Sequence, residues 1–269
     1  MFTPSLDGAL FSSPVGKIVC VGRNYAAHAA ELNNPVPDTP VLFIKPADAA
    51  CDLQAPLSIP LSQGDVHHEL EVAVLIGKRL QKASEAEVSG ALAGVGLGLD
   101  LTLRDVQSVL KEKGLPWERA KAFDGSCPLS PFVSAARVSD WQNLNFSLHR
   151  NGAQQQSGNS ADMLNPVLSL IAHMSHSFTL NPGDVVMTGT PPGVGPLNVG
   201  DSLELALEDW VAVKTEVVTT TPVKEVVTYD YSPVSTTYTY SSPVRTSYVY
   251  DDYYYPRYSY TSPRYYRSA

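Results

Sequence analysis

Short apolar runs separated by turn residues dominate the first 218 positions of the chain. The runs are rich in Val, Ile and Leu, and Gly, Pro, Asn or Asp lie between them, which is typical of β-strands. The pair Asn151 and Gly152 predicts a hairpin turn. Strands are predicted in KIVCVGRN, VLFIKP, ELEVAVLIGK, VGLGLDLT, LNFSLHRNG and DSLELALE.

Helical patterns are fewer and shorter, at about residues 25–32, 84–93, 103–113 and 164–175. Residues 187–201 contain so much Gly and Pro that they predict an ordered loop, either one that holds backbone N–H groups near a ligand or a plain surface turn. Its GVG lacks the strand, spacing and helix of a dinucleotide-binding fingerprint. The pattern predicts an α+β fold with one dominant bent sheet, a mixed and mostly β roll or barrel.

The composition changes near Val218, and thirteen of the fourteen tyrosines follow it. Residues 231–240 and 241–250 repeat S-P-V-x-T-x-Y-x-Y, and no Leu, Ile, Phe, Met or Trp occurs after residue 218. Such a segment cannot build an aliphatic core. We therefore expect a folded domain over residues 1–218 and a disordered, low-complexity tail rich in Tyr, Ser, Thr and Pro over residues 219–269.

Charge and cysteine usage narrow the class of protein. The 269-residue chain has a formal net charge of -8 and no long basic run, which argues against nucleic acid as a partner. Its three cysteines have no CxxC spacing, which favours a reducing compartment. With no apolar stretch near the roughly 18 residues of a membrane span and no signal-peptide pattern, a soluble cytoplasmic protein without a membrane partner is expected.

The stretch VHHELEVAVLIGK, residues 66–78, contains two carboxylates inside an apolar run. On a strand Glu69 and Glu71 share one face while Leu70 and Val72 share the other. An unpaired buried charge costs roughly several kcal/mol, so the pair needs an explanation. Three interpretations are open: an edge strand whose carboxylates face water, an acid/base pair, and a site for Mg²⁺, Mn²⁺ or Ca²⁺.

Further polar residues extend this region. Asp100 ends the run GLGLD and supplies a third carboxylate for an octahedral Mg²⁺ or Mn²⁺, or else caps a helix beginning near Leu103. His28 and Glu31 lie three apart on one helix face, either as a dyad that activates water or as a solvated face. Lys45 and Lys121 follow apolar segments and either bind an anionic substrate or extend to the surface.

Six blocks of the chain resemble the fumarylacetoacetate hydrolase superfamily in type and order. The chain is most similar to the small single-domain branch of acylpyruvases and fumarylpyruvate hydrolases, over about residues 8–218. The tail has no counterpart in this resemblance. The blocks are GRNYAAHAAEL, PVLFIKPADA, HHELEVAVLIGK, LDLTLRDVQ, KGLPWERAKAFDGSCPLSPFV and GDVVMTGTPPGVGPL.

The resemblance implies the mixed β-roll of the fumarylacetoacetate hydrolase C-terminal domain, a homodimer, and one Mg²⁺ or Mn²⁺ per subunit. The implied metal ligands are Glu69, Glu71 and Asp100. The implied catalytic residues are His28 and Glu31, which activate water, and Lys121, which stabilises an enolate. His67 and His68 flank the ligands. The implied substrate-binding residues are Arg23, Tyr25, Lys45, Gln107, Gly189 and Thr190.

The expected activity is metal-dependent hydrolysis of the C–C bond of an acylpyruvate, a 2-oxo acid of aromatic catabolism, to pyruvate and a carboxylic acid. The same pocket would also serve an oxaloacetate decarboxylase or keto–enol tautomerase, or an isomerase or hydratase of unsaturated dioic acids. A different class stays open as well: an interaction protein with a vestigial enzyme domain and a functional Tyr-rich tail. Metal binding discriminates between the enzyme and the interaction protein.

Overall fold

The structure is a computed structural model, and it describes residues 1–32, 35–60 and 63–219. The chain divides into two units, Met1–Pro222 and Val223–Ala269. The second unit lies outside the described residues, as does the predicted disordered tail apart from Thr219, which ends strand β18 (Val211–Thr219). Among the described residues, no helix has the length and apolar character needed to cross a membrane.

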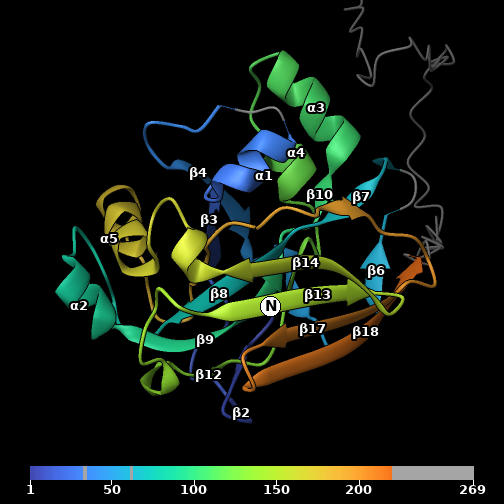
Figure 1. The fold of residues 1–269 in the computed structure, drawn as a ribbon. Coiled ribbons are helices and arrows are strands. Elements are labelled where there is room, and N and C mark those ends of the chain that lie inside the picture. Colours follow the sequence, from blue (N-terminus) through green and yellow to red (C-terminus); the bar gives the residue numbers. More distant parts are fainter. Residues whose placement is uncertain (33–34, 61–62, 220–269) are drawn as a thin grey trace, which may run out of the picture. The chain divides into compact units, whose positions relative to one another are not determined.

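An eight-stranded mixed sheet organises the first unit (Figure 1). Its strands follow the order β4, β3, β15, β8, β9, β11 and β5, and β12 pairs with β9. The pairs β15–β3 and β11–β5 are parallel and the others are antiparallel. The strands are β3 (Lys17–Gly22), β4 (Val41–Pro46), β5 (Ala50–Asp52), β8 (Leu70–Ile76), β9 (Leu92–Leu99), β11 (Cys127–Leu129), β12 (Val133–Ser134) and β15 (Val185–Met187).

A second sheet of five strands has the order β14, β13, β17, β18 and β6. The predicted hairpin joins β13 and β14, and Asn151 and Gly152 have φ angles of 53° and 79°, the left-handed conformation that this turn requires. In two smaller sheets, β7 pairs with β10 and β16, and β1 pairs with β2. These strands are β1 (Ser5–Leu6), β2 (Ala9–Leu10), β6 (Leu57–Ile59), β7 (Val66–His68), β10 (Thr102–Leu103), β13 (Asn145–Arg150), β14 (Ala153–Asn159), β16 (Gly195–Pro196), β17 (Ser202–Leu207) and β18 (Val211–Thr219).

The described helices are short, and the four predicted ones are present. Three have narrower bounds than predicted, and the fourth begins three residues later and ends two residues later. Residues 187–201 form mostly loop, as predicted, and contain the two-residue β16. Helix α4 was not predicted. The helices are α1 (Ala26–Glu31), α2 (Glu85–Ser89), α3 (Arg104–Glu112), α4 (Glu118–Lys121) and α5 (Val167–Ser177), with 3-10 turns η1 (Ala47–Ala49), η3 (Ala135–Arg137) and η4 (Ser160–Asp162). The predicted mixed, mostly β fold is confirmed.

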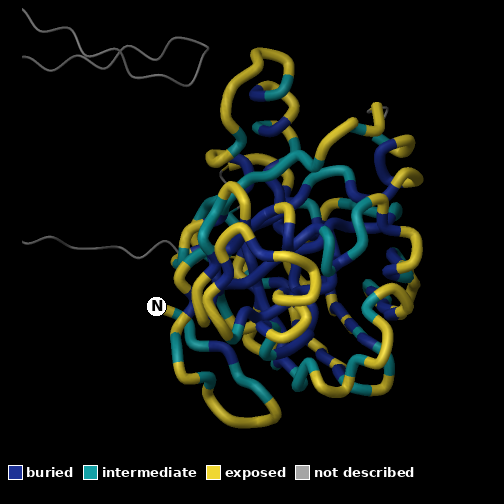
Figure 2. Tube along the Cα trace, turned by 90° about the vertical axis from the view of Figure 1, so that its left-hand side faces the viewer, coloured by how far each residue is buried: buried dark blue, intermediate teal, exposed yellow. Residues whose placement is uncertain are grey.

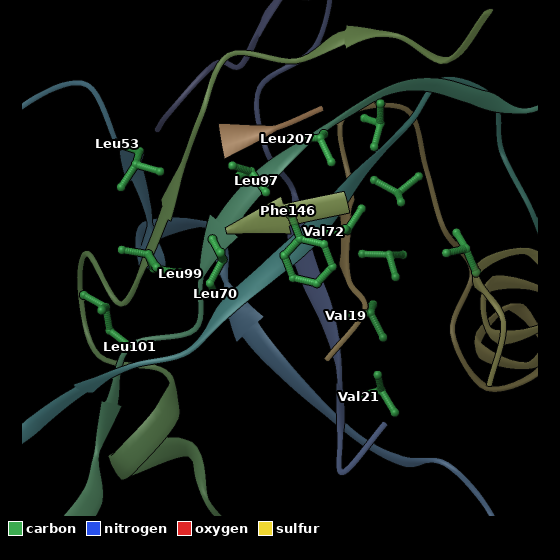
Figure 3. Close-up of a cluster of buried hydrophobic side chains, with 14 of the residues drawn as sticks. Val19, Val21, Leu53, Leu70, Val72, Leu97, Leu99, Leu101, Phe146 and Leu207 are labelled. Carbon is green, nitrogen blue, oxygen red and sulfur yellow. The ribbon is translucent and has the colours of Figure 1, made fainter. Parts of the chain in front are cut away.

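Strand β8 is buried on both faces, which explains its nearly continuous apolar sequence. Leu70 and Val72 point into the larger core cluster, where Phe146 and Leu207 of the second sheet meet them (Figure 3). Alternate residues of β8, including Ala73, pack into a second cluster on the other face. Buried residues run through the middle of this unit, and exposed ones concentrate in its connecting loops (Figure 2). The core therefore holds the start of β8 in a fixed position.

Candidate active site

Three carboxylates meet where β8 begins and β9 ends. Glu69 precedes β8, Glu71 lies within it, and Asp100 follows β9; antiparallel pairing of Leu70 with Leu99 brings them together. The Asp100 N–H donates to the Glu69 carbonyl at 2.8 Å. One oxygen from each carboxylate lies within 4.8 Å of the others, and the three residues are 1–5% exposed. The interpretation in which Glu69 and Glu71 face water on an edge strand is therefore wrong.

Asp100 belongs to this cluster and does not cap a helix. The N-cap of α3 is Leu103, with no side-chain hydrogen bond. The Asp100 carboxylate instead accepts from the Lys121 ammonium at 2.6 Å. The capping interpretation of Asp100 is therefore wrong.

Two cations neutralise part of the cluster from the pocket side. Lys121 Nζ donates to Glu69 Oε2 at 2.8 Å, and Arg104 donates to Glu69 Oε1. Burial raises the pKa of Glu69, but Lys121 and Arg104 outweigh burial and hold that pKa well below its usual range. Burial likewise lowers the pKa of Lys121, but Asp100 and Glu69 raise it more. Glu69 and Lys121 therefore stay charged at neutral pH.

Glu71 is placed differently from the other two carboxylates. It accepts a hydrogen bond from the Gly189 backbone N–H at 2.6 Å. Burial and the nearby Asp100 raise its pKa well above the usual range. A divalent cation bound to these oxygens would offset both causes, and three carboxylates are the hard oxygen donors that Mg²⁺ and Mn²⁺ prefer. The donor set therefore fits such an ion.

Lys45 lies behind the cluster and does not line the pocket. Its side chain is fully buried, and Nζ lies 2.8 Å from Asp100 Oδ1, an ion pair outside hydrogen-bond geometry. The ammonium donates to the carbonyls of Leu101, Lys121 and Ser126. The structure thus gives Lys45 a supporting position, where the sequence resemblance implied a substrate contact.

A small pocket opens above the carboxylates, and α1 and α3 lie at this end of the unit (Figure 1). His28 is 5% exposed and lines the pocket. The interpretation that His28 lies on a solvated helix face is therefore wrong. Its Nδ1 donates to Glu31 Oε2 at 3.1 Å, because a carboxylate accepts. Nε2 is the nitrogen left for the pocket. Other lining residues are Arg23, Phe43, Arg104, Gln107, Lys111, Trp117, Lys121 and Thr190.

Two residues predicted to bind substrate support the pocket from outside its lining. Tyr25 packs edge-on against Phe146 at 6.5 Å, and burial, with Glu71 nearby, raises the pKa of its phenol above the usual range. Gly189 has a φ of 94°, and a Cβ there would lie 2.6 Å from Asn24 Cβ. Glycine is therefore required for the loop to bring its N–H to Glu71.

The comparisons with known proteins agree with this geometry. A family model described as Fumarylacetoacetate (FAA) hydrolase C-terminal matches residues 17–218. The chain belongs to this family. It is 57% identical over 203 residues to oxaloacetate tautomerase YcgM of Escherichia coli (strain K12), covering 75% of this chain and 93% of that protein. It is 41% identical over 196 residues to human mitochondrial oxaloacetate tautomerase FAHD1, and the match covers 73% of this chain and 89% of that protein.

Solved structures of the FAA hydrolase family share the fold. Fumarylpyruvate hydrolase from Pseudomonas aeruginosa, in complex with Mn²⁺ and pyruvate, is 34% identical with a TM-score of 0.76, covering 81% of this chain and 96% of that one. A family member from Oleispira antarctica is 57% identical with a TM-score of 0.78, and the match covers 81% of this chain and 100% of that one. The predicted superfamily and branch are confirmed. The more similar relatives favour oxaloacetate chemistry over acylpyruvate hydrolysis, and the expected homodimer stays a prediction.

Sequence reasoning missed Arg104, although it lines the pocket and holds Glu69. Its Nη1 donates to Gln107 Oε1 at 2.6 Å, so both side chains share one face of α3. The spacing of three residues between Arg104 and Gln107 in LRDVQ indicates a shared helix face, and it could have identified Arg104 as a pocket residue. Lys111 lies four residues further on the same face and was missed as well.

Gln156 on β14 was missed because nothing in the run QQQ separates it from its neighbours. Its amide nitrogen donates to Thr190 Oγ1 at 2.8 Å and to the Pro191 carbonyl at 2.9 Å. Its oxygen accepts from Leu70 N–H and His68 Nδ1, both at 2.9 Å. Burial lowers the pKa of His68, which keeps the ring neutral with its proton on Nδ1. Gln156 therefore joins the metal-ligand strand to the pocket loop.

Proposed function

We propose that this FAA hydrolase family member is an oxaloacetate keto–enol tautomerase that uses a divalent cation. The observation that carries the proposal is the cluster of Glu69, Glu71 and Asp100 with the Lys121 ammonium in hydrogen-bond contact. Such a cluster favours reactions that pass through an enolate. The 57% identity to a named oxaloacetate tautomerase, against 34% to a named fumarylpyruvate hydrolase, supports tautomerisation.

Tautomerisation moves one proton within oxaloacetate. C3 loses a proton, the C2–C3 bond becomes double, and the C2 oxygen gains a proton. A Mg²⁺ or Mn²⁺ held by Glu69, Glu71 and Asp100 would polarise the 2-oxo acid and stabilise the negative charge on the C2 oxygen. Lys121 adds a fixed positive charge beside the same oxygen, and its raised pKa keeps it an ammonium.

His28 is the candidate for moving the proton. Glu31 holds Nδ1, so Nε2 faces the pocket and takes the proton from C3. The resulting imidazolium, stabilised by the Glu31 carboxylate, returns a proton to the C2 oxygen. The ring finishes in its starting state, so no other reactant is needed.

Two related reactions have observations in their favour. Cleavage of the C3–C4 bond of oxaloacetate would give CO₂ and the enolate of pyruvate, which a proton at C3 converts to pyruvate. The chain is 40% identical to the Dictyostelium discoideum mitochondrial oxaloacetate decarboxylase. Hydrolysis of an acylpyruvate needs an activated water, which the His28–Glu31 contact of 3.1 Å would supply. Hydrolysis is the second candidate because the named hydrolase is a more distant relative.

The test compares all three reactions in one preparation with Mn²⁺ or Mg²⁺. Enol decay of oxaloacetate is followed by absorbance, and pyruvate release is followed from oxaloacetate, fumarylpyruvate and acetylpyruvate. His28→Ala and Lys121→Met are expected to lower tautomerisation by about 100-fold or more. The control is His173→Ala, at an exposed histidine of α5.

Faster turnover of fumarylpyruvate than of oxaloacetate would replace the proposal by the hydrolase. A wild-type chain that binds no Mn²⁺ by titration calorimetry would instead favour the interaction protein with a vestigial enzyme domain. Unchanged tautomerisation in His28→Ala would remove His28 from the proton transfer.

A further inference from the structure

One face of α3 runs from the carboxylate cluster towards the outer part of the pocket. Arg104, Gln107 and Lys111 are spaced by three and four residues, so their side chains share this face, and all three line the pocket. Arg104 reaches Glu69 and Gln107 contacts Arg104. Lys111 begins about 10 Å further along the axis, at 1.5 Å per residue. The helix therefore places one cation at the cluster and another away from it.

Arg23 enters the same pocket from the loop after β3. Its φ of 61° is in the left-handed region, which residues other than Gly, Asn and Asp rarely adopt. Asn24 holds this turn, because its fully buried amide donates to the carbonyls of Thr188 and Asn165 and accepts from the Asn165 N–H. The strained backbone is thus fixed on both sides, which keeps Arg23 directed at the pocket.

Four cations line the pocket beside the carboxylate cluster. They are Arg23, Arg104, Lys111 and Lys121. Arg104 and Lys121 donate hydrogen bonds to Glu69, and Arg23 and Lys111 are the two further cations of the lining. Burial lowers the pKa of Lys111, and the positive charge of Arg23 lowers it further. Arg23 and Lys111 therefore repel each other, and a bound anion would reduce that repulsion.

We propose that Lys111, together with Arg23, selects 2-oxo acids that carry a second carboxylate by binding that distal group. The inference rests on the proposed function in one respect: the 2-oxo acid end of the substrate binds at the carboxylate cluster. Lys111 is then the specificity-determining residue of the pocket. It discriminates between acids that share the reactive end and differ only in the distal charge.

The experiment is titration calorimetry of the Mn²⁺-loaded full chain with two unreactive acids, L-malate and L-lactate. Both have a 2-hydroxy acid end, and L-malate alone has a second carboxylate. Wild type should bind L-malate more tightly, and Lys111→Met should weaken L-malate binding about tenfold while leaving L-lactate unchanged, since a charged hydrogen bond is lost. The KM for oxaloacetate should rise by a similar factor.

Lys113→Met is the matched control, because Lys113 is exposed, two residues away and on another face of the helix. Lys111→Arg should restore most of the L-malate affinity. Equal losses for both acids, no loss in Lys111→Met, or equal wild-type affinities would each overturn the proposal. Because binding is measured without turnover, failure of the tautomerase assay is a separate result.

Discussion

A single buried ammonium supports the site from behind. Lys45 is among the largest fully buried side chains of the described residues. It contacts Asp100 and the backbone carbonyls of Leu101, Lys121 and Ser126. A buried charge of this kind is tolerated only with close partners. Lys45 therefore positions Asp100 and the segment that contains Lys121.

Replacing Lys45 by Met should destabilise the protein strongly. The change leaves the buried Asp100 carboxylate without this partner and the Leu101 carbonyl without its ammonium donor, which costs about 3–5 kcal/mol of unfolding free energy. Urea denaturation measures this loss, and Mn²⁺ titration should show weaker binding. Lys78→Met, at an exposed lysine, is the control. A loss below about 1 kcal/mol would show that Lys45 does not support the cluster.

The cysteines should react slowly in the folded state. Burial raises the pKa of the Cys51 thiol to about 11, and Cys20 and Cys127 are fully buried. At pH 8 the thiolate fraction of Cys51 is then more than about 100-fold below that of a free cysteine with a pKa near 8.5. Labelling with a thiol reagent at pH 8 should be slow before urea is added and fast afterwards. Rapid labelling of Cys51 without urea contradicts this pKa.

At the scale of elements, the loop after β15 joins parts of the site that come from distant segments. Gly189 N–H donates to Glu71, and Gly193 N–H donates to Glu31 Oε1 at 2.9 Å. Gly193 has a φ of 96°, and a Cβ there would lie 2.0 Å from the Gln155 carbonyl oxygen. One loop therefore contacts the metal-ligand strand, the His28 helix and strand β14.

Gln156→Leu should disconnect this loop from β8. Leucine has a similar volume but leaves Leu70 N–H, His68 Nδ1 and the Pro191 carbonyl without their partner in a buried position. The expected loss of unfolding free energy is about 2–5 kcal/mol, with weaker Mn²⁺ binding. Gln154→Leu, at an exposed position of the same strand, should change stability by less than about 0.5 kcal/mol. Equal effects of the two variants would rule out the connecting role.

At the scale of the whole molecule, every proposed site residue lies between Arg23 and Gly193, within the unit Met1–Pro222. Removing residues 220–269 should therefore leave the melting temperature, Mn²⁺ affinity and turnover unchanged. Calorimetry and the oxaloacetate assay on the full and shortened chains measure this. A large loss of any of the three would show that the predicted boundary near Val218 is wrong.

The local elements were largely predictable from the order of residues. The apolar run ELEVAVLIGK predicted β8. Glu69 and Glu71 were expected on one face because side chains along a strand alternate whatever surrounds it. Asn151–Gly152 predicted the hairpin for a similarly local reason, its left-handed φ angles. Helix α4 was missed because four residues carry too little periodicity to detect.

The sequence by itself determined six strands (β3, β4, β8, β9, β13 and β17), the family and the candidate carboxylates, since these depend on local spacing and on ordered blocks of residues. Only the tertiary structure decided how they combine. Whether Lys45 faces the pocket or supports Asp100, and whether Gln156 differs from Gln154, depends on contacts between residues that are 34 to 88 positions apart. Such contacts follow from packing of the two sheets, and neither side chain has a sequence neighbour that reveals its partner.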